Sequence, residues 1–527
     1  MVFDYLITDG LVVDGSGCPP YRATVAIDGD RIQLFRGRND GLEARRTISA
    51  EGQAVAPGFI DFHAHSGLVL LAEPKHEAKV QQGVTAEVIG VDGNSYAPFV
   101  SREQLLEFRD VNAGLDGAPP LEYDWLSVSD YLMHFDNTTS VNVAYVVGNS
   151  PLRMMEIGWE NRDATAAELS NMRARLREAI EEGAFGLSTG LDYPPGEYAS
   201  TSELTELCRT AAELGGIYHS HIRYTLGDQY LDPLREAIAI CRDSGAPCHI
   251  THLYKSAAMA KRGGAEPILG LLEDAADIGV EVTFDTYPYN YSSTRLCYLL
   301  PSWAFDRGRD GVYEVLRSSE GRQKIRDQYS RQEDIAWDDM WVTNLHLAEH
   351  SEFDGRTIAE IARLLGCDPV TAVCELLERE ELQPSFISLM DQGYSRAKFI
   401  AHPLAMFGSD AMLLGEFPSP RTYGTFPRVL SEFVREERYL SLPEAIHKMT
   451  AFPATRLGLK NRGLLRDGYA ADVVVFDPAT VSSPATRQQP KQMPTGIRLV
   501  FVNGQLVVEG GKHTGALPGR ALRRGQD

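Results

Sequence analysis

Eight short apolar segments between residues 55 and 458 constrain the fold of this chain more than any other feature of its sequence. Between them lie longer amphipathic segments, such as AAELSNMRARLREAIEEG and DPLREAIAICRDSG. Alternating strands and helices are typical of a parallel sheet with crossover helices, and eight repeats favour a closed (β/α)8 barrel. We therefore predict an α/β fold built on a TIM-like barrel. The strand segments are VAPGFIDFHAH, VTAEVIGVDG, SVNVAYVVGNS, GAFGLSTG, GGIYHSHIR, PCHITHLYK, VEVTFDTYPY and AMFGSDA.

The two ends of the chain carry a different pattern, in which short apolar strands are separated by turn residues. Residues 1–54 contain Asp-Gly and Gly-Asp turns, and the C-terminal part contains an Asn-Gly pair typical of a hairpin. We predict that residues 1–54 and 459–527 form one small β-sandwich domain beside a catalytic barrel of residues 55–458. The segment 297–345 is longer than a crossover needs, so we predict an insertion near the active-site face, for which a lid is one role.

Charge and composition narrow the possible partners. The 527-residue chain has a formal net charge of −22, which disfavours nucleic acid and anionic membranes as partners. No apolar run reaches about 18 residues, and the first residues lack the features of a secretory signal. The 7 cysteines form no CxxC motif, which is typical of reduced thiols in the cytoplasm. We therefore predict a cytoplasmic protein that acts on small molecules.

Histidine and aspartate residues stand where the predicted strands end. The first strand ends on His63 and His65, and residues two apart on a strand point to the same side. Both imidazoles can therefore bind one divalent ion. A single histidine at such a place is more often an ordinary core or surface residue, but a set on five strand ends indicates a site for one or two metal ions. The other members are Asp92, His219, His221, His249, His252 and Asp410.

Asp410 follows a short apolar run and a Gly-Ser pair. A buried carboxylate without a partner is costly, whereas one beside a metal ion is not. Such a carboxylate can also take a proton from a water molecule at the metal, so we predict that Asp410 is the general base. The alternative is a helix N-cap before AMLLGEF.

Several of these segments together resemble the amidohydrolase superfamily and, within it, the D-aminoacylase (N-acyl-D-amino-acid deacylase) family. The resemblance covers nearly the whole chain, and its C-terminal segments are the most specific. It rests on PGFIDFHAH, GAFGLSTGLDYPPGEYAS, GGIYHSHIR, ITHLYK, DTYPYNYSST, FGSDA, SPRTYGTFPRVLSEFVRE, LSLPEAIHKMTAFPATRLGL and RGLLRDGYAADVVVFDP.

The resemblance implies a zinc enzyme that cleaves the amide bond of N-acyl-D-amino acids or of a related carboxylate-bearing amide. Metal-activated water would attack the amide, with Asp410 as general base and then general acid. Arg421 would bind the substrate carboxylate, a task that suits a guanidinium fork. The implied metal ligands are His63, His65, His221, His252 and Asp410, and the implied substrate-binding residues are Arg421, Tyr193, Lys255, Tyr287 and Ser293.

Two departures from the family pattern concern the pocket. Asp92 stands where the family has a cysteine ligand, and as a harder ligand it makes Mn²⁺, Co²⁺ or Fe²⁺ plausible beside Zn²⁺. The fourth strand contains no lysine, so Asp92 is the best candidate to bridge two ions. In addition, Tyr254 precedes Lys255 where the family has its lysine, and the Arg223-Tyr224 pair also differs. These changes concern substrate specificity and leave the hydrolytic chemistry in place.

Two other functions compete with this hypothesis. A cyclic-amide hydrolase of the hydantoinase or dihydroorotase type uses a similar metal site, but such enzymes commonly carry a lysine on the fourth strand and lack the PRTYGTFPR run. A non-catalytic metal-binding scaffold is the second alternative. It would have no need for the exposed general base that Asp410 supplies.

Overall fold

The computed structural model describes residues 2–37, 41–253, 263–330, 335–390 and 396–526. Eight parallel strand positions close into the predicted barrel, in which β10 and β11 together form the third position. The first and last positions meet through a parallel bridge between Ala64 and Ala411. The barrel strands are β8 (Phe59–Asp61), β9 (Val84–Ile89), β10 (Asn142–Tyr145), β11 (Val147–Gly148), β12 (Gly186–Gly190), β13 (Ile217–His221), β14 (Cys248–Ile250), β15 (Val282–Thr286) and β19 (Ala405–Phe407).

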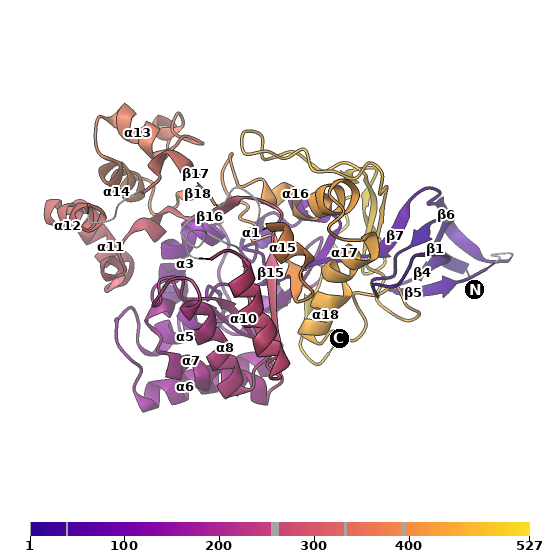
Figure 1. Ribbon diagram of the computed structural model, residues 1–527, viewed down its shortest axis with the longest axis horizontal. Coiled ribbons are helices and arrows are strands. Elements are labelled where there is room, and N and C mark those ends of the chain that lie inside the picture. Colours follow the sequence, from indigo (N-terminus) through magenta and orange to yellow (C-terminus); the bar gives the residue numbers. More distant parts are fainter. Residues whose placement is uncertain (1, 38–40, 254–262, 331–334, 391–395, 527) are drawn as a thin grey trace.

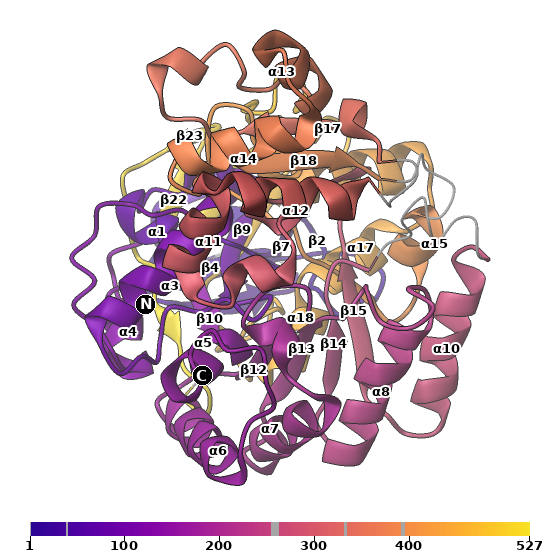
Figure 2. The same ribbon diagram turned by 90° about the vertical axis from the view of Figure 1, so that its left-hand side faces the viewer.

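Helices cover the outside of the barrel, and α6, α7, α8 and α10 follow one another along its lower edge (Figure 2). Local sequence explains several helix starts. Thr165 and Glu168 form a capping box at α6, and Ser441 and Glu444 form another at α17. The longer helices are α3 (Arg102–Asp116), α5 (Asn149–Glu156), α6 (Ala166–Glu181), α7 (Thr201–Glu213), α8 (Asp232–Ser244), α10 (Glu266–Asp277), α16 (Arg421–Arg428), α17 (Leu442–Met449) and α18 (Ala451–Leu457). The shorter ones are α1 (Val69–Ala72), α2 (Glu77–Val80), α4 (Val128–Met133) and α15 (Arg396–Ala401).

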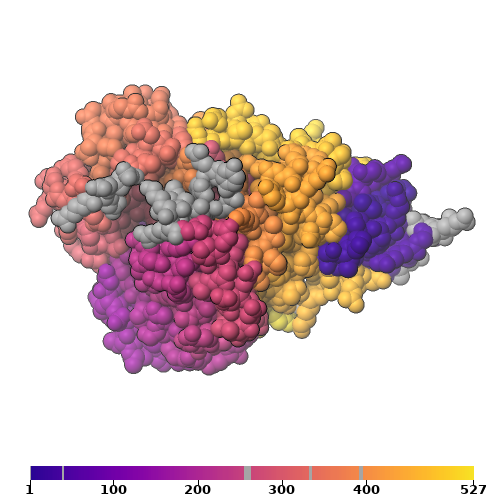
Figure 3. All heavy atoms as spheres, in the orientation of Figure 1, coloured from indigo at the N-terminus to yellow at the C-terminus, as the bar shows by residue number. Residues whose placement is uncertain are grey.

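Strands from both ends of the chain form two sheets that pack face to face, which confirms the predicted sandwich. One sheet has the order β5-β4-β1-β6, and it lies at the end of the molecule (Figures 1 and 3). The other has the order β23-β22-β21-β20-β7-β2-β3. Their strands are β1 (Val2–Thr8), β2 (Leu11–Val12), β3 (Tyr21–Arg22), β4 (Thr24–Asp28), β5 (Arg31–Phe35), β6 (Glu43–Ser49), β7 (Ala54–Pro57), β20 (Val473–Phe476), β21 (Ile497–Val502), β22 (Gln505–Glu509) and β23 (Lys512–His513).

The run VAPGFIDFHAH is not one strand, as the sequence pattern predicts, but two. β7 belongs to the sandwich, where it pairs with β20 and β2, and the barrel strand β8 begins only at Phe59. Gly58 lies between them, and a Cβ atom there would lie 2.1 Å from Thr85 Oγ1. The chain therefore passes from one domain to the other within a single apolar run. The exact domain boundaries stay a prediction.

Between β15 and β19 the chain forms a separate three-stranded antiparallel sheet with its own helices, at the upper left of Figure 1. These elements extend on both sides of the segment 297–345, and a lid function for them stays a prediction. They are β16 (Tyr291–Arg295), α11 (Gly308–Arg317), α12 (Ser319–Tyr329), β17 (Met340–Thr343), α13 (Ile358–Leu365), α14 (Pro369–Arg379) and β18 (Ser385–Leu389).

The Asn503-Gly504 hairpin occurs where the sequence predicts it, between β21 and β22. Both residues have positive φ, +47° and +80°, as this tight turn requires. Within the described parts of the chain, every helix is too short or too polar to cross a lipid bilayer.

Candidate metal centre

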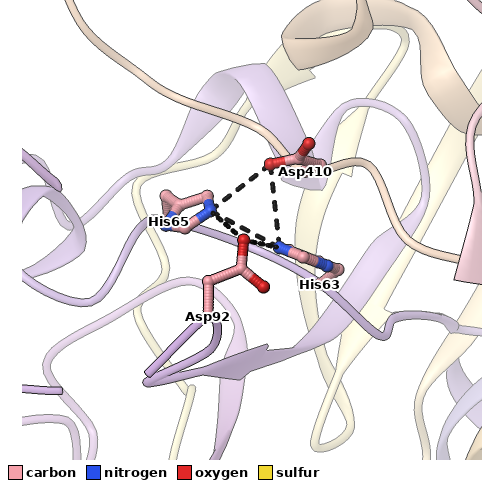
Figure 4. Close-up of side chains that lie close together, drawn as sticks. All are labelled: His63, His65, Asp92 and Asp410. Atoms are coloured by element: carbon pink, nitrogen blue, oxygen red, sulfur yellow. Dashed lines mark hydrogen bonds and ion pairs between the residues drawn. The ribbon is translucent and has the colours of Figure 1, made fainter. Parts of the chain in front are cut away.

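Six side chains that the sequence singles out lie together at the C-terminal ends of the barrel strands. His63 and His65 follow β8, Asp92 follows β9, and Asp410 follows β19; Figure 4 shows these four side chains pointing toward one another. His221 is the last residue of β13, and His252 lies just after β14. All six are buried, and their donor atoms fall into two groups that share Asp92. We call His63, His65 and Asp410 the first half of the centre, and His221 and His252 the second half.

Asp92 connects the two halves. Its Oδ2 atom lies 3.4 Å from His63 Nε2 and 3.6 Å from His65 Nε2. The same atom lies 3.5 Å from His221 Nδ1 and 3.4 Å from His252 Nε2. One carboxylate oxygen thus faces four imidazole nitrogens, two from each half.

Three of the six residues hold a backbone conformation that side chains rarely adopt. The φ angles are +52° at Asp92, +34° at His252 and +48° at Asp410. Each such residue costs of order 1–3 kcal/mol, and it persists only where its surroundings hold it. At Asp410 the loop is held by backbone hydrogen bonds, from Asp410 N to His63 O at 2.8 Å and from His65 N to Ala411 O at 3.1 Å.

Each imidazole has a polar partner behind it. In the first half, His65 Nδ1 lies 2.9 Å from Asp116 Oδ1, and His63 Nδ1 lies 3.5 Å from Asp285 Oδ2. Such outer carboxylates fix the ring orientation and the tautomer of a metal ligand.

In the second half, His221 Nε2 lies 3.3 Å from Asp192 Oδ2, and His252 Nδ1 lies 3.4 Å from the Tyr224 hydroxyl. The sequence patterns do not predict that Asp116, Asp285 or Asp192 belongs to the site. Of these three residues, only Asp285 could have been found from the sequence, because it lies in a predicted barrel strand, VEVTFDTYPY.

The electrostatics of the centre suit a cation. Burial opposes protonation of His63, but the carboxylates of Asp92, Asp285 and Asp410 outweigh it and raise the pKa of His63 to about 10. Burial alone would raise the pKa of the Asp92 carboxyl, yet the neighbouring histidines hold this pKa well below its usual value. A buried set of nitrogen and oxygen donors that attracts positive charge so strongly fits a divalent metal ion.

Two histidines of the predicted ring lie outside the centre. His219 and His249 stack with ring centroids 5.0 Å apart, and His249 Nε2 lies 2.9 Å from Asp285 Oδ2. Burial lowers the pKa of both rings, to about 4 for His249, so both are neutral. The His219 ring centroid lies 5.6 Å from that of His63, and His219, His63 and Asp285 form a further group of donor atoms close to one another.

A cavity of about 290 Å³ opens beside the two halves, and Asp92, Asp410 and all the ligand histidines except His63 line it. Three predicted substrate-binding residues line it as well. The Tyr193 hydroxyl lies 3.0 Å from Thr294 Oγ1, and its ring lies 5.0 Å from that of His221. Tyr287 and Ser293 stand on the wall formed by β16 and the residues before it.

Arg421 lies behind Asp410 and does not line the cavity in this structure. Its Nη2 atom is 2.9 Å from Asp410 Oδ2, its guanidinium donates to the Tyr291 and Ser293 carbonyls, and it lies over the Tyr287 ring. Burial raises the pKa of Asp410, but Arg421 and the histidines outweigh it and hold the pKa below its usual value. Lys255, also predicted to bind substrate, and Tyr254 lie outside the described residues. The roles of all predicted site residues stay predictions.

The barrel and the donor groups at its mouth define the class of the protein, a (β/α)8 barrel with a candidate site for metal ions. Residues 46–508 match the amidohydrolase family, and the chain belongs to this family. The N-acyl-D-aspartate deacylase of Alcaligenes xylosoxydans xylosoxydans is 35% identical over 524 residues, which cover 99% of this chain and 95% of the relative.

Solved structures give the same result. An N-acyl-D-glutamate deacylase from Bordetella bronchiseptica, complexed with zinc and a phosphonate mimic of the tetrahedral intermediate, is 33% identical with a TM-score of 0.83. A D-aminoacylase with a binuclear metal centre is 33% identical with a TM-score of 0.81. Each comparison covers 99% of this chain and 100% of the other. The resemblance to the D-aminoacylase family is thereby confirmed.

Proposed function

We propose that this protein is a metal-dependent deacylase that hydrolyses the amide bond of N-acyl-D-amino acids. The observation that carries the proposal is the position of Asp410, which lines the cavity with one face and approaches His63 and His65 with its Oδ1 atom, at 3.7 and 3.3 Å. In this position Asp410 would act as an acid–base group between the proposed metal ligands and the space for a substrate. Three relatives that match over 99% of this chain are named N-acyl-D-aspartate deacylase, D-aminoacylase and N-acyl-D-glutamate deacylase.

Asp410 performs the proton transfers of the reaction. A divalent ion held by the residues of the centre would lower the pKa of water and polarise the amide carbonyl. Arg421 favours the ionised form of Asp410, which accepts a proton from the attacking water. Asp410 then donates this proton to the amine nitrogen as the amide bond breaks. The same side chain thus accepts the proton and returns it.

Zn²⁺ is the ion that we propose, held by His63, His65, Asp92, His221, His252 and Asp410. The described structure offers two donor groups that share Asp92, which suits either one ion or two. Because Asp92 is a carboxylate where the family has a thiolate, we expect Mn²⁺ or Co²⁺ to support activity as well.

The substrate carboxylate lies on the Tyr287–Ser293 wall, backed by the positive charge of Arg421. Beyond it, the described wall of the cavity is mostly apolar, with Leu115, Leu299, Met340, Phe386 and two tyrosines, Tyr224 and Tyr298. Burying a charged side chain against such a surface is costly. We therefore expect D-amino acids with uncharged side chains to be better substrates than D-aspartate or D-glutamate.

A substrate panel tests this proposal. Metal-replete protein is given the N-acetyl derivatives of D- and L-leucine, methionine, aspartate and glutamate, with hydantoin and dihydrouracil as cyclic amides, and the products are separated on a chiral column. We expect D-leucine and D-methionine to be released fastest. Release from the cyclic amides alone would overturn the proposal, and faster release of D-aspartate would overturn only the side-chain preference.

A further inference from the structure

A group of fully buried charges lies directly behind the first half of the metal centre. Asp61 on β8, Lys79 on α2 and Glu87 on β9 each have no exposed surface, and His76 is 3% exposed. Lys79 Nζ contacts Asp61 Oδ2 and lies 3.7 Å from Glu87 Oε1, while His76 Nε2 lies 2.9 Å from Glu87 Oε2. None of these four residues lines the cavity beside the metal centre. These four residues therefore take no direct part in the proposed proton transfers or in substrate binding.

Asp61 uses both of its oxygens to join two loops that carry metal ligands. Oδ1 accepts hydrogen bonds from the backbone nitrogens of His63, at 3.2 Å, and Ser409, at 2.8 Å. Oδ2 accepts hydrogen bonds from Lys79 Nζ and from Ser409 Oγ, the latter at 2.5 Å. The Asp61 carboxylate thus holds His63, which is a candidate ligand, and Ser409, which directly precedes the candidate ligand Asp410.

Lys79 holds this carboxylate in place from the opposite side. Its ammonium lies 2.7 Å from Ser409 Oγ, so Asp61, Lys79 and Ser409 form a closed triangle of hydrogen bonds. Removing one partner of a buried ion pair leaves the other charge uncompensated, which is strongly destabilising. Apolar side chains would fill the same volume at a lower desolvation cost, so the charges are expected to serve the geometry of the loops that they join.

The position of Asp410 relative to His63 and His65 requires an unusual backbone conformation. Asp410, directly after Ser409, has a φ of +48°, and its Oδ1 must stay within reach of both His63 Nε2 and His65 Nε2. Two backbone hydrogen bonds join the loops near this point, and Ser409 Oγ lies 3.4 Å from His63 O. The Asp61 carboxylate adds a contact that accepts hydrogen bonds from backbone nitrogens of both loops.

We propose that Asp61, held by Lys79, is a positioning residue that sets the distance between the His63–His65 pair and Asp410, and thereby the metal affinity of the first half. The inference rests on the metal centre of the proposed function but not on its substrate. Because the second half has no contact with Asp61 among the described residues, the effect is confined to the first half.

The test is a titration of the full-length, metal-free protein with Zn²⁺ in a metal buffer, with bound metal measured directly. His65→Ala identifies the binding step that belongs to the first half. We expect Asp61→Asn and Lys79→Met each to weaken this same step by about 10- to 100-fold, the range found for outer-shell partners, and to leave the other step unchanged. In the same variants, kcat falls while KM stays close to its original value.

A matched control separates positioning from general stability. Arg153 and Glu203 form another buried ion pair, at 2.6 Å with 0% and 2% exposed side chains, away from the ligands. Arg153→Met removes the same kind of buried partner as Lys79→Met. Ser409→Ala is a milder variant that buries no unpaired charge, and we expect a weaker first step in it even if Asp61→Asn fails to fold.

The outcomes are distinct. Zinc binding to the first half that is unchanged in Ser409→Ala and in either charge variant would overturn the inference, as would an equal loss in Arg153→Met. If the unmodified protein binds no metal, the proposed function itself fails. If it binds metal but releases no D-amino acid, the substrate proposal fails while the positioning role of Asp61 is still measured.

Discussion

The two halves of the metal centre contribute imidazoles of the same kind but differ in what stands behind them. Behind the first half lie carboxylates in the interior of the barrel, Asp285 with 0% and Asp116 with 4% of its surface exposed. Behind the second half lie Asp192 and the Tyr224 hydroxyl, both of which line the substrate cavity. The supports of the first half are therefore out of reach of a substrate, whereas the side chains behind the second half form part of the pocket wall. Asp285 also accepts a hydrogen bond from the His252 backbone nitrogen, at 2.8 Å.

The geometry of the histidines is therefore controlled in different ways in the two halves. The first half depends on fixed buried charges, so its geometry is set when the chain folds. The second half shares its supports with the pocket, so a bound substrate can alter the surroundings of His221 and His252 directly. Asp92 is the one ligand that belongs to both environments.

We expect the largest difference between the two halves from replacement of Asp410, because this residue is both a predicted ligand of the first half and the proposed acid–base group. We expect Asp410→Asn to lower kcat roughly 10²- to 10⁴-fold while the second half still binds metal. Steady-state kinetics and metal analysis of the same preparation measure both effects. Activity within tenfold of the unmodified enzyme would remove Asp410 from the mechanism.

Replacement of Asp92 tests whether the halves are joined. We expect Asp92→Ala to weaken metal binding in both halves, since it removes the shared oxygen. Asp92→Cys restores a ligand of a softer kind, so we expect it to favour Zn²⁺ over Mn²⁺ by roughly tenfold relative to the unmodified protein. Competition titrations with the two metals measure this ratio. Loss of only one binding step in Asp92→Ala would contradict a bridging role.

A pair of matched changes sharpens the contrast between the supports. Asp116→Asn and Asp192→Asn each weaken a carboxylate–histidine contact, one in each half. We expect each change to weaken metal binding by about tenfold, and only in its own half. Asp192→Asn should also raise KM because Asp192 lines the cavity, whereas Asp116→Asn should not. Equal KM values in the two variants would argue against the distinction between buried and pocket-facing supports.

The smallest effect on the centre is expected from the sandwich. Gly504 has a φ of +80°, and a Cβ atom there would lie 1.8 Å from Gly29 O. Gly510→Ala is the matched control, because Gly510 has a φ of +58° but nothing lies within 4 Å. We expect Gly510→Ala to lower the free energy of unfolding by about 1 kcal/mol and Gly504→Ala by more. Denaturant unfolding measures both values, and metal affinity should stay the same in each variant.

Local sequence patterns were sufficient for the strands and for the residues at their ends, because barrel geometry brings such ends together whatever the loops do. They were not sufficient for the supports. Asp116 is the last residue of helix α3, and nothing in its sequence surroundings indicates that it reaches His65. Lys79 lies on a four-residue helix, and its burial depends on packing against Ser409, which lies 330 residues away along the chain. The division of the run around Gly58 into two strands likewise depends on tertiary pairing.

That division has a consequence for the order in which the chain folds during synthesis. β7 lies just before the metal-binding strand, and its partner β20 pairs Val473 with Pro57, more than four hundred residues away along a chain of 527. Contacts of such long sequence separation form slowly and late. The ribosome must therefore synthesise most of the chain before β7 can pair with β20. The segment that leads into β8, and with it the His63–His65 pair, reaches its final surroundings only after one of the last strands has been made.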